Sequence, residues 1–322
     1  MIILVALCLS LREKPDNHRR KNGIADRLDT TTTATVRLQY RKVFLSLGDQ
    51  DIMKLEILMS CMHQVDDTLV QRSHIYGDAV VINQCDTDAY AQYPTRDGLA
   101  RMFSTTQRGL TKSRNMAIRN SDADICLLSD DDEVFAPGYV KKIVEAYESL
   151  PQADVIIFKM ENREPSFPDQ IMRLRFPKTM KVSSWQISFR RQRLMAAGVW
   201  FDELMGAGSG NGAEEELKFL TDCEKAGLQI WYVPVVIAAV AQQCSTWFDG
   251  FTEQFFEDRG GTTRYIMGAP LAVAYGVYYV VKKRNMYADS LAPALAMKAI
   301  LRGIRKNKIT KQARKLVKER NR

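Results

Sequence analysis

The sequence predicts an α/β fold in which a mostly parallel β-sheet is flanked by helices. From Met53 onward, short segments rich in Val, Ile and Leu alternate with segments of helical periodicity. Such alternation is typical of parallel sheets whose strands are joined by helices. The composition, 46% hydrophobic and 26% charged over 322 residues, is that of a globular protein with room for one large domain and appendages.

The predicted strands and helices follow one another in order. The strands are Glu56–Ser60, Ala79–Asn83, Ile125–Ser129, Val155–Lys159 and Ile230–Val233. The helices are Thr111–Asn120, a segment that opens at Pro137, and Glu214–Ala226 with Gly227 as its C-cap. Because ligands of such sheets bind beyond the carboxyl ends of the strands, we expect the functional residues there.

The two ends of the chain differ from this central part. Residues 1–52 join a short apolar start to a Thr-rich stretch, without the basic residues that open a secretory signal. We expect them to be disordered or a wrongly assigned N-terminal extension, with Met53 as the true start. A folded domain is expected over 53–265 and a helical, basic segment over 266–322.

The C-terminal segment joins an apolar run to a basic tail. Ile266–Val281 has sixteen residues, includes Pro270 and is short for a membrane span. Residues 301–322 hold ten Lys or Arg against Glu319, a charge of +9, so the rest of the chain contributes −1 to the net +8. The pattern suits a helix at an anionic membrane surface, and a buried helix with a solvated tail is the alternative. No nucleic-acid-binding motif accompanies the tail.

The cysteines and histidines do not form a metal or disulfide pattern. No two of the six cysteines are spaced as a CxxC pair, and most of them lie in apolar stretches. This pattern indicates buried, reduced thiols in a reducing compartment such as the cytoplasm. The three histidines, His18, His63 and His74, are too scattered to form a metal centre.

Three adjacent carboxylates, Asp130, Asp131 and Asp132, follow the predicted strand Ile125–Ser129 directly. Like charges at this spacing raise each other's pKa, so a cation is expected to stabilise them. Mg²⁺ and Mn²⁺ prefer such oxygen ligands. If the strand geometry continues, Asp130 and Asp132 face one side and Asp131 the other. A solvated acidic turn before a helix is the alternative.

Two glycine-containing segments are candidates for ligand binding and catalysis. Arg108–Asn115 places basic side chains at a helix start, which suits phosphate binding. Gly206–Gly212 holds four glycines in seven residues, and we expect a mobile loop that lets backbone approach a ligand. The loop leads to the glutamates Glu214–Glu216. One of them can accept a proton from a hydroxyl group, although glutamates also stabilise helix N-termini.

Two tryptophan-containing segments complete the set. Trp185 is a candidate platform for a sugar or a base, and core packing explains a single tryptophan equally well. Ser245–Phe248 is a candidate for bringing polar groups to a bound ligand, such as a diphosphate or a second substrate.

Together these segments resemble a family 2 glycosyltransferase of GT-A fold, the Rossmann-like fold of many bacterial polysaccharide and glycolipid enzymes. The resemblance spans about residues 53–265 and rests on Val80–Asp86, Arg108–Ala117, Ile125–Glu133, Phe201–Asp202, Glu214–Leu217, Gly227–Pro234 and Ser245–Phe248, which match in order and spacing. The family often carries Glu-Asp where this chain has Glu-Glu.

The resemblance implies a role for each candidate residue. Asp130 and Asp132 would form the DxD pair that holds Mn²⁺ or Mg²⁺. The nucleotide-sugar site would comprise Ser60, Met62, Asp86, Arg114, Asn115, Asp130 and, as the platform, Trp185. Glu214 or Glu215 would be the general base, in a reaction that inverts the anomeric carbon without an enzyme nucleophile.

The implied function is metal-dependent transfer of a sugar from a nucleotide-sugar, by family habit a UDP-sugar, to a carbohydrate or lipid-linked acceptor. The resemblance implies a cytoplasmic protein that can associate peripherally with the inner face of the membrane. A sugar-nucleotide nucleotidyltransferase is one alternative, but Ser60–Val65 lacks the Gly-rich, basic loop usual after its first strand. A catalytically inactive, membrane-bound scaffold of the same fold is the other, and the intact acidic clusters argue against it.

Overall fold

A computed structural model describes residues 53–163, 167–211, 214–240 and 250–320 of the chain. The expected extension over 1–52 and the candidate segment Ser245–Phe248 lie outside the described residues. The description of the fold applies to these ranges.

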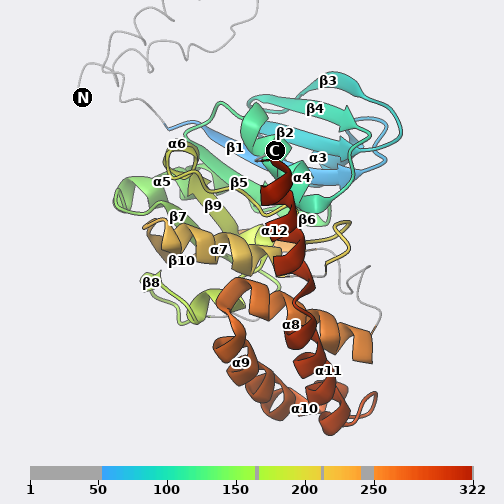
Figure 1. The fold of residues 1–322 in the computed structure, drawn as a ribbon. Coiled ribbons are helices and arrows are strands. Elements are labelled where there is room, and N and C mark those ends of the chain that lie inside the picture. The colour runs from blue at the N-terminus through green and yellow to red at the C-terminus, as the bar shows by residue number, and fades with distance from the viewer. Residues whose placement is uncertain (1–52, 164–166, 212–213, 241–249, 321–322) are drawn as a thin grey trace, which may run out of the picture. The chain divides into compact units, whose positions relative to one another are not determined.

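A ten-stranded sheet forms the centre of the described part, with the strand order β3-β4-β2-β1-β5-β9-β7-β10-β6 and β8 paired to β10 (Figure 1). The strands are β1 (Leu55–Met62), β2 (Asp78–Gln84), β3 (Ala89–Pro94), β4 (Leu99–Thr105), β5 (Ile125–Ser129), β6 (Glu133–Phe135), β7 (Val155–Met160), β8 (Met172–Leu174), β9 (Ile187–Arg190) and β10 (Ile230–Val240).

The sheet is mostly parallel, as predicted. β1, β2, β4 and β5 run in one direction, and so do β7 and β10, which are linked to them through β9, antiparallel to both β5 and β7. The antiparallel strands lie at the edges, apart from β9. The carboxyl ends of β1, β2 and β5 therefore meet at one edge of the sheet.

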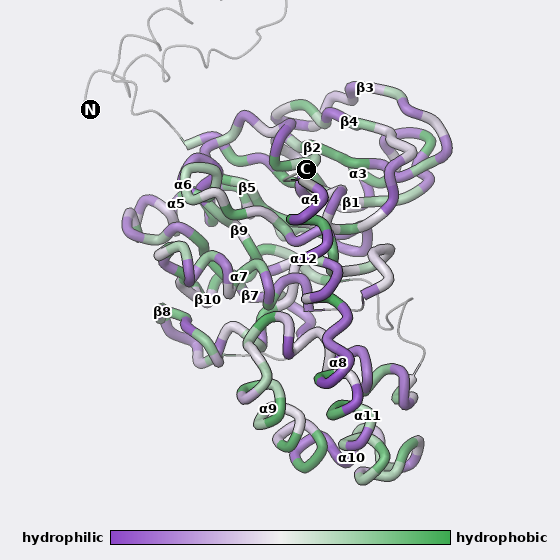
Figure 2. Tube along the Cα trace, viewed as in Figure 1, coloured by the Kyte–Doolittle hydropathy of each residue, from purple (hydrophilic) through white to green (hydrophobic). Residues whose placement is uncertain are grey.

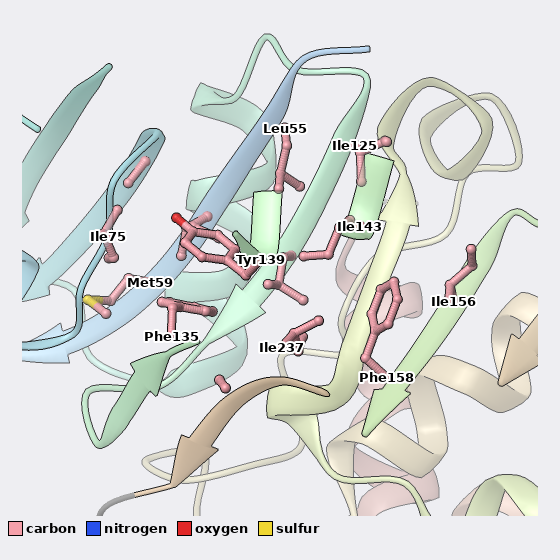
Figure 3. Packing of buried hydrophobic residues seen from close by; sticks show 14 of the residues in the cluster. Leu55, Met59, Ile75, Ile125, Phe135, Tyr139, Ile143, Ile156, Phe158 and Ile237 are labelled. Atoms are coloured by element: carbon pink, nitrogen blue, oxygen red, sulfur yellow. The ribbon is translucent and has the colours of Figure 1, made fainter. Parts of the chain in front are cut away.

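Helices cover both faces of the sheet because alternate strand residues point to opposite faces. The helices are α3 (Thr68–Arg72), α4 (Leu110–Asn120), α5 (Tyr139–Ser149), α6 (Arg191–Ala196) and α7 (Glu215–Lys225), and two short 3-10 helices are η1 (Lys178–Lys181) and η2 (Ser184–Gln186). Ile57 and Met59 of β1 pack in the core with α3 and α5, whereas Leu58 packs on the opposite face with α4, α6 and α7. Figure 3 shows Tyr139 and Ile143 of α5 among the side chains of the strands.

All five predicted strands and all three predicted helices are present. β5 has the predicted bounds, and β10 extends seven residues beyond Val233. The strands that the pattern did not predict are β3, β4, β6, β8 and β9. They are three to seven residues long, and β3 is largely exposed at the sheet edge, so they carry little apolar periodicity.

Five helices follow the sheet: α8 (Glu253–Met267), α9 (Ala269–Lys282), α10 (Arg284–Tyr287), α11 (Pro293–Lys306) and α12 (Lys308–Arg320) (Figure 1). α8 and α11 cross at glycines, where backbones approach closely. A Cβ atom on Gly303 would lie 1.8 Å from the Glu257 carbonyl oxygen, and one on Gly260 would lie 2.2 Å from that of Ile300. Met205, Leu217 and Ile266 form a small core that joins this helical unit to the sheet domain.

The predicted apolar run is divided between two helices. It ends α8, turns at Gly268 with φ +83°, and continues as α9, with Pro270 in the first turn. α8, the first helix of this unit, begins at Glu253, and the domain boundary at residue 266 stays a prediction. Among the described residues, no helix has both the length and the apolar character needed to cross a membrane.

Candidate active site

Arg114 connects the acidic residues at the carboxyl edge of the sheet. It lies on α4 and is almost fully buried. Its guanidinium is 3.1 Å from Asp130 Oδ1, 3.4 Å from Glu215 Oε1 and 3.8 Å from Glu216 Oε1. Burial by itself would lower the Arg114 pKa, but these three carboxylates raise it overall. The acidic triplet and the glutamate cluster, which are far apart in the sequence, thus share one buried cation.

The acidic triplet forms a turn. β5 ends at Ser129, β6 begins at Glu133, and Asp131 and Asp132 occupy the turn between them. The alternation expected from a continuing strand is therefore wrong, because the chain reverses direction to pair β6 with β10. Asp130 Oδ1 accepts from Arg114 and its Oδ2 accepts from the Ser184 hydroxyl at 2.8 Å.

The other acidic residues of this turn carry raised pKa values. Burial, then the charge of Asp130, raises the pKa of Asp131 and of Asp132, and the charge of Asp131 raises that of Asp132 further. The same two causes raise the pKa of Glu133 well above its ordinary range. Glu133 Oε1 accepts from the Asp130 amide, while Oε2 is buried without a hydrogen-bond partner in the described part of the chain. This turn has more negative charge than its protein neighbours neutralise.

These properties fit a divalent cation held with a substrate. Within the described ranges, no three His, Cys, Asp or Glu side chains are grouped to hold a metal ion. Mg²⁺ sites commonly combine one or two carboxylates with substrate phosphates, and the partly buried Asp132 and Asp130 could act as such carboxylates. A bound cation would lower the raised carboxylate pKa values.

The predicted nucleotide residues lie near one another at the ends of β1 and β2, with different exposures. The Ser60 hydroxyl is buried and accepts from the Ser113 hydroxyl at 2.8 Å. Met62 is 47% exposed at the end of β1. Asp86 follows β2 and pairs with Arg108 at 2.7 Å.

The polar groups of the basic segment at the start of α4 mostly form hydrogen bonds within the protein. Arg108 donates to the carbonyl oxygens of Cys85 and Thr105 and pairs with Asp86. The Gly109 amide donates to Gln84 Oε1 at 2.7 Å. Lys112 is the exposed basic side chain of this stretch.

Asn115 and Trp185 have mainly structural surroundings. Asn115 is buried, accepts from the Phe201 amide and donates to the Phe201 carbonyl, so it fixes the chain after α6. Trp185 is half-buried on η2, packs against the core beside the sheet, and has the Arg163 guanidinium 5.7 Å from its ring centroid. Its neighbour Ser184 reaches Asp130.

The glycine loop approaches α4 closely. Ala207 accepts from the Leu110 amide at 3.0 Å, and a Cβ on Gly208 would lie 3.0 Å from Gly109 Cα. Of the described glycines of this loop, Gly208 is therefore the one whose lack of a side chain permits contact with the protein's own backbone. Asn211 donates to Gln312 of α12, so the C-terminal helix contacts this loop.

The three glutamates at the start of α7 have distinct environments. Glu215 is buried against Arg114. Burial and the neighbouring Glu215 raise the pKa of Glu216 to about 8. Glu214 is 21% exposed, has a left-handed backbone with φ +83°, and pairs through Oε1 with Arg259 at 2.7 Å. Glu214 is thus partly exposed, and its cationic partner is Arg259 rather than Arg114.

Sequence reasoning missed Ser184, Gln84, Glu133 and Arg259. Ser184 adjoins the predicted Trp185 and could have been found from the Ser183–Gln186 capping box. Arg259 lies on α8, forty-five residues after Glu214, in a segment without a recognisable motif.

Comparisons with known proteins concern the fold and the central segment of the chain. Residues 79–201 match the family model described as Glycosyl transferase family 2. The fold is similar to that of S. aureus TarS 1-349 in complex with UDP-GlcNAc, with TM-score 0.51 and 11% identity, covering 74% of each chain. The complex of the same protein with UDP gives TM-score 0.50 and 14% identity over 74% of this chain and 75% of that one. No curated protein matches the sequence.

At these identities the TarS structures show the fold alone, and the likeness to the family is confined to the matched segment, residues 79–201. That segment contains most of β2, all of α4 and β5, and the acidic turn. These elements form much of the carboxyl edge of the sheet, where Arg114 contacts Asp130. Residues 79–201 therefore resemble family 2 glycosyltransferases, and the described part of the chain has an α/β fold similar to that of TarS.

Proposed function

We propose that the protein transfers a sugar from a UDP-sugar to a hydroxyl of a carbohydrate or lipid-linked acceptor, with inversion at the anomeric carbon. The observation that carries the proposal is the Arg114 cluster, which couples an acidic turn beside β5 to glutamates at the start of α7. The UDP and UDP-GlcNAc complexes of the similar TarS fold support uridine as the donor base.

Glu214 is the residue we assign as general base. Glu215 is buried behind Arg114, and Glu216, with a pKa of about 8, is mostly protonated at neutral pH. Glu214 has one carboxylate oxygen, Oε1, on Arg259, and its Oε2 accepts no hydrogen bond within the described part of the chain. A free oxygen on a partly exposed carboxylate can take the acceptor proton.

Asp132, with Asp130, would hold Mn²⁺ or Mg²⁺. The cation, when bound, supplies positive charge to the departing diphosphate. Ser60, Met62 and Asp86 would line the nucleotide site, where Met62 is the exposed member and Asp86 is kept in place by Arg108. Arg114 would fix Asp130 rather than touch the donor, because its guanidinium is enclosed by carboxylates.

The reaction is tested with a donor panel of UDP-Glc, UDP-Gal, UDP-GlcNAc, UDP-GalNAc and GDP-Man, scored for Mn²⁺-dependent nucleotide release. We expect release from one UDP-sugar, and a loss of about 10²–10⁴-fold in kcat for Glu214→Gln, as for removal of a general base. Nucleotide release by Glu214→Gln at the wild-type rate would refute the base assignment. Silence of the wild-type chain across the panel would refute the proposed function.

We further propose that α9 docks on an anionic membrane, where a lipid-linked acceptor would be presented. Its outer face is apolar yet exposed, with exposed fractions of 51% for Leu271, 50% for Val277 and 64% for Val281. The exposed cations Lys282, Lys283 and Arg284 follow this face directly. Figure 2 shows α9 as largely hydrophobic and α12 as largely hydrophilic. An apolar face bordered by cations suits an anionic bilayer.

Co-sedimentation with vesicles tests this surface. Wild-type protein should bind phosphatidylglycerol-containing vesicles more tightly than pure phosphatidylcholine vesicles, and Val277→Glu with Val281→Glu should abolish binding. Ile171→Glu, at a 52% exposed apolar residue before β8, is the matched control and should bind normally. Equal binding by the α9 variant, or a dimer of the wild-type chain that only the α9 variant disrupts, would contradict membrane docking.

A further inference from the structure

Arg259 links the C-terminal helices to the proposed base. It lies on α8, and its guanidinium carbon is 4.4 Å from the Tyr279 ring centroid and 4.9 Å from that of Phe255. Its Nη1 donates to Glu214 Oε1 at 2.7 Å and to the Tyr275 hydroxyl at 2.9 Å. Two aromatic faces and a phenol thus fix the direction from which Arg259 meets Glu214.

Glu214 is held in an unfavourable backbone conformation. With φ +83° and ψ 21° it occupies the left-handed region, which costs a side-chain-bearing residue about 1–3 kcal/mol. The residue precedes the first turn of α7, and its own side chain makes no capping hydrogen bond there. Such a conformation persists only when its surroundings impose it, and within the described ranges the ion pair with Arg259 holds the side chain.

A role in stability alone explains Arg259 poorly. Its Nε is buried without a hydrogen-bond partner within the described ranges, so its burial leaves one donor unsatisfied. Buried ion pairs often contribute little net stability, because desolvation offsets their attraction. Geometry at Glu214 is the better explanation for an arginine at this position.

We propose that Arg259 is a positioning residue for Glu214. By holding Oε1, it keeps the carboxylate fixed at the start of α7 and leaves Oε2 without a hydrogen-bond partner in the described part of the chain. The inference rests on the proposed role of Glu214. It makes the helical unit after residue 250, which lies outside the matched segment 79–201, part of the catalytic machinery.

The inference also connects the two faces of α9. Tyr275 and Tyr279, which contact Arg259, lie on the inner face of the helix whose outer face is exposed and apolar. Arg259 therefore contacts both α9 and Glu214.

Three variants of the full chain test the positioning role: Arg259→Met, Arg259→Lys and the control Arg302→Met. Arg302 pairs with Glu253 and Glu257 on the same helical unit, away from Glu214. The measurements are kcat for UDP release from the active donor with water as acceptor, the Kd for UDP, and hydrogen–deuterium exchange of the first turn of α7.

We expect Arg259→Met to lower kcat about 10²-fold with an unchanged Kd for UDP, since misplacement of a catalytic group by about 1 Å costs this much. Arg259→Lys should recover part of kcat, and exchange should rise in the first turn of α7 only for the Arg259 variants. Arg302→Met should leave kcat and this exchange unchanged.

The positioning role is overturned if Arg259→Met keeps the wild-type kcat, or if its Kd for UDP and its exchange across the whole sheet domain change together with kcat. A wild-type chain that is silent on every donor would refute the proposed function instead. In that case the exchange data still decide whether Arg259 fixes Glu214, because that measurement needs no activity.

Discussion

Replacing Arg114 with Met should destabilise the protein far more than replacing an arginine at its surface. The buried guanidinium lies 3.1 Å from Asp130 and 3.4 Å from Glu215. At an effective dielectric constant of about 20, each such charge pair is worth roughly 5 kcal/mol before desolvation. Removing one member of a buried charge cluster costs about 3–5 kcal/mol, because the remaining carboxylates are left uncompensated. We expect a loss of that size at pH 7.

The assay is urea unfolding followed by tryptophan fluorescence, with Arg96→Met as the matched control. Arg96 pairs with Asp97 at the surface, so its removal should produce no measurable loss. A loss at pH 7 no larger than that of Arg96→Met would refute the role of Arg114 as the common partner of these carboxylates.

Three further predictions concern the acidic residues and the helical unit. Glu216 has a folded-state pKa of about 8, raised from 4.5, so the folded state holds the proton of this carboxyl more tightly than the unfolded state does. The protein therefore loses stability as the pH rises from about 4.5 to 8. Glu216→Gln should unfold at a higher urea concentration than wild type at pH 8.5, and at the same urea concentration at pH 5. Gly303→Ala should cost at least 1–3 kcal/mol by overpacking, whereas Gly261→Ala, whose Cβ would meet an oxygen at 3.8 Å, should not destabilise. Asp132→Asn should abolish the rise in melting temperature that Mn²⁺ with UDP gives to wild type, and an undiminished rise would contradict metal binding there.

Much of the fold could be predicted from the sequence because its buried strands are continuous apolar runs. Ile125–Ser129 is buried along its whole length, and its pattern predicted the observed bounds. β3 and β9 were not predictable in this way, since one is an exposed edge strand and the other has four residues. β9 inserts antiparallel between β5 and β7, and its pairing with β5 joins segments that are far apart in the chain.

The candidate site was predictable in its residue types and only partly in its roles. The acidic triplet and the glutamate cluster were evident from composition and position. Their connection through Arg114, and the use of Asn115 to hold the Phe201 backbone, depend on side-chain directions that no spacing rule supplies. The glycine loop was expected to approach a ligand, but its close contact is with the start of α4.

The sequence by itself determined that this chain has an α/β sheet with an acidic cluster behind a central strand, because hydrophobic periodicity and local charge are properties of short segments. Only the tertiary structure decided which carboxylates share a cation, and that Glu214 meets an arginine from the C-terminal helices. These pairings arise because segments distant in the sequence are buried together. Burying a charge without a partner costs free energy, and the geometry of the fold determines which partner lies within reach.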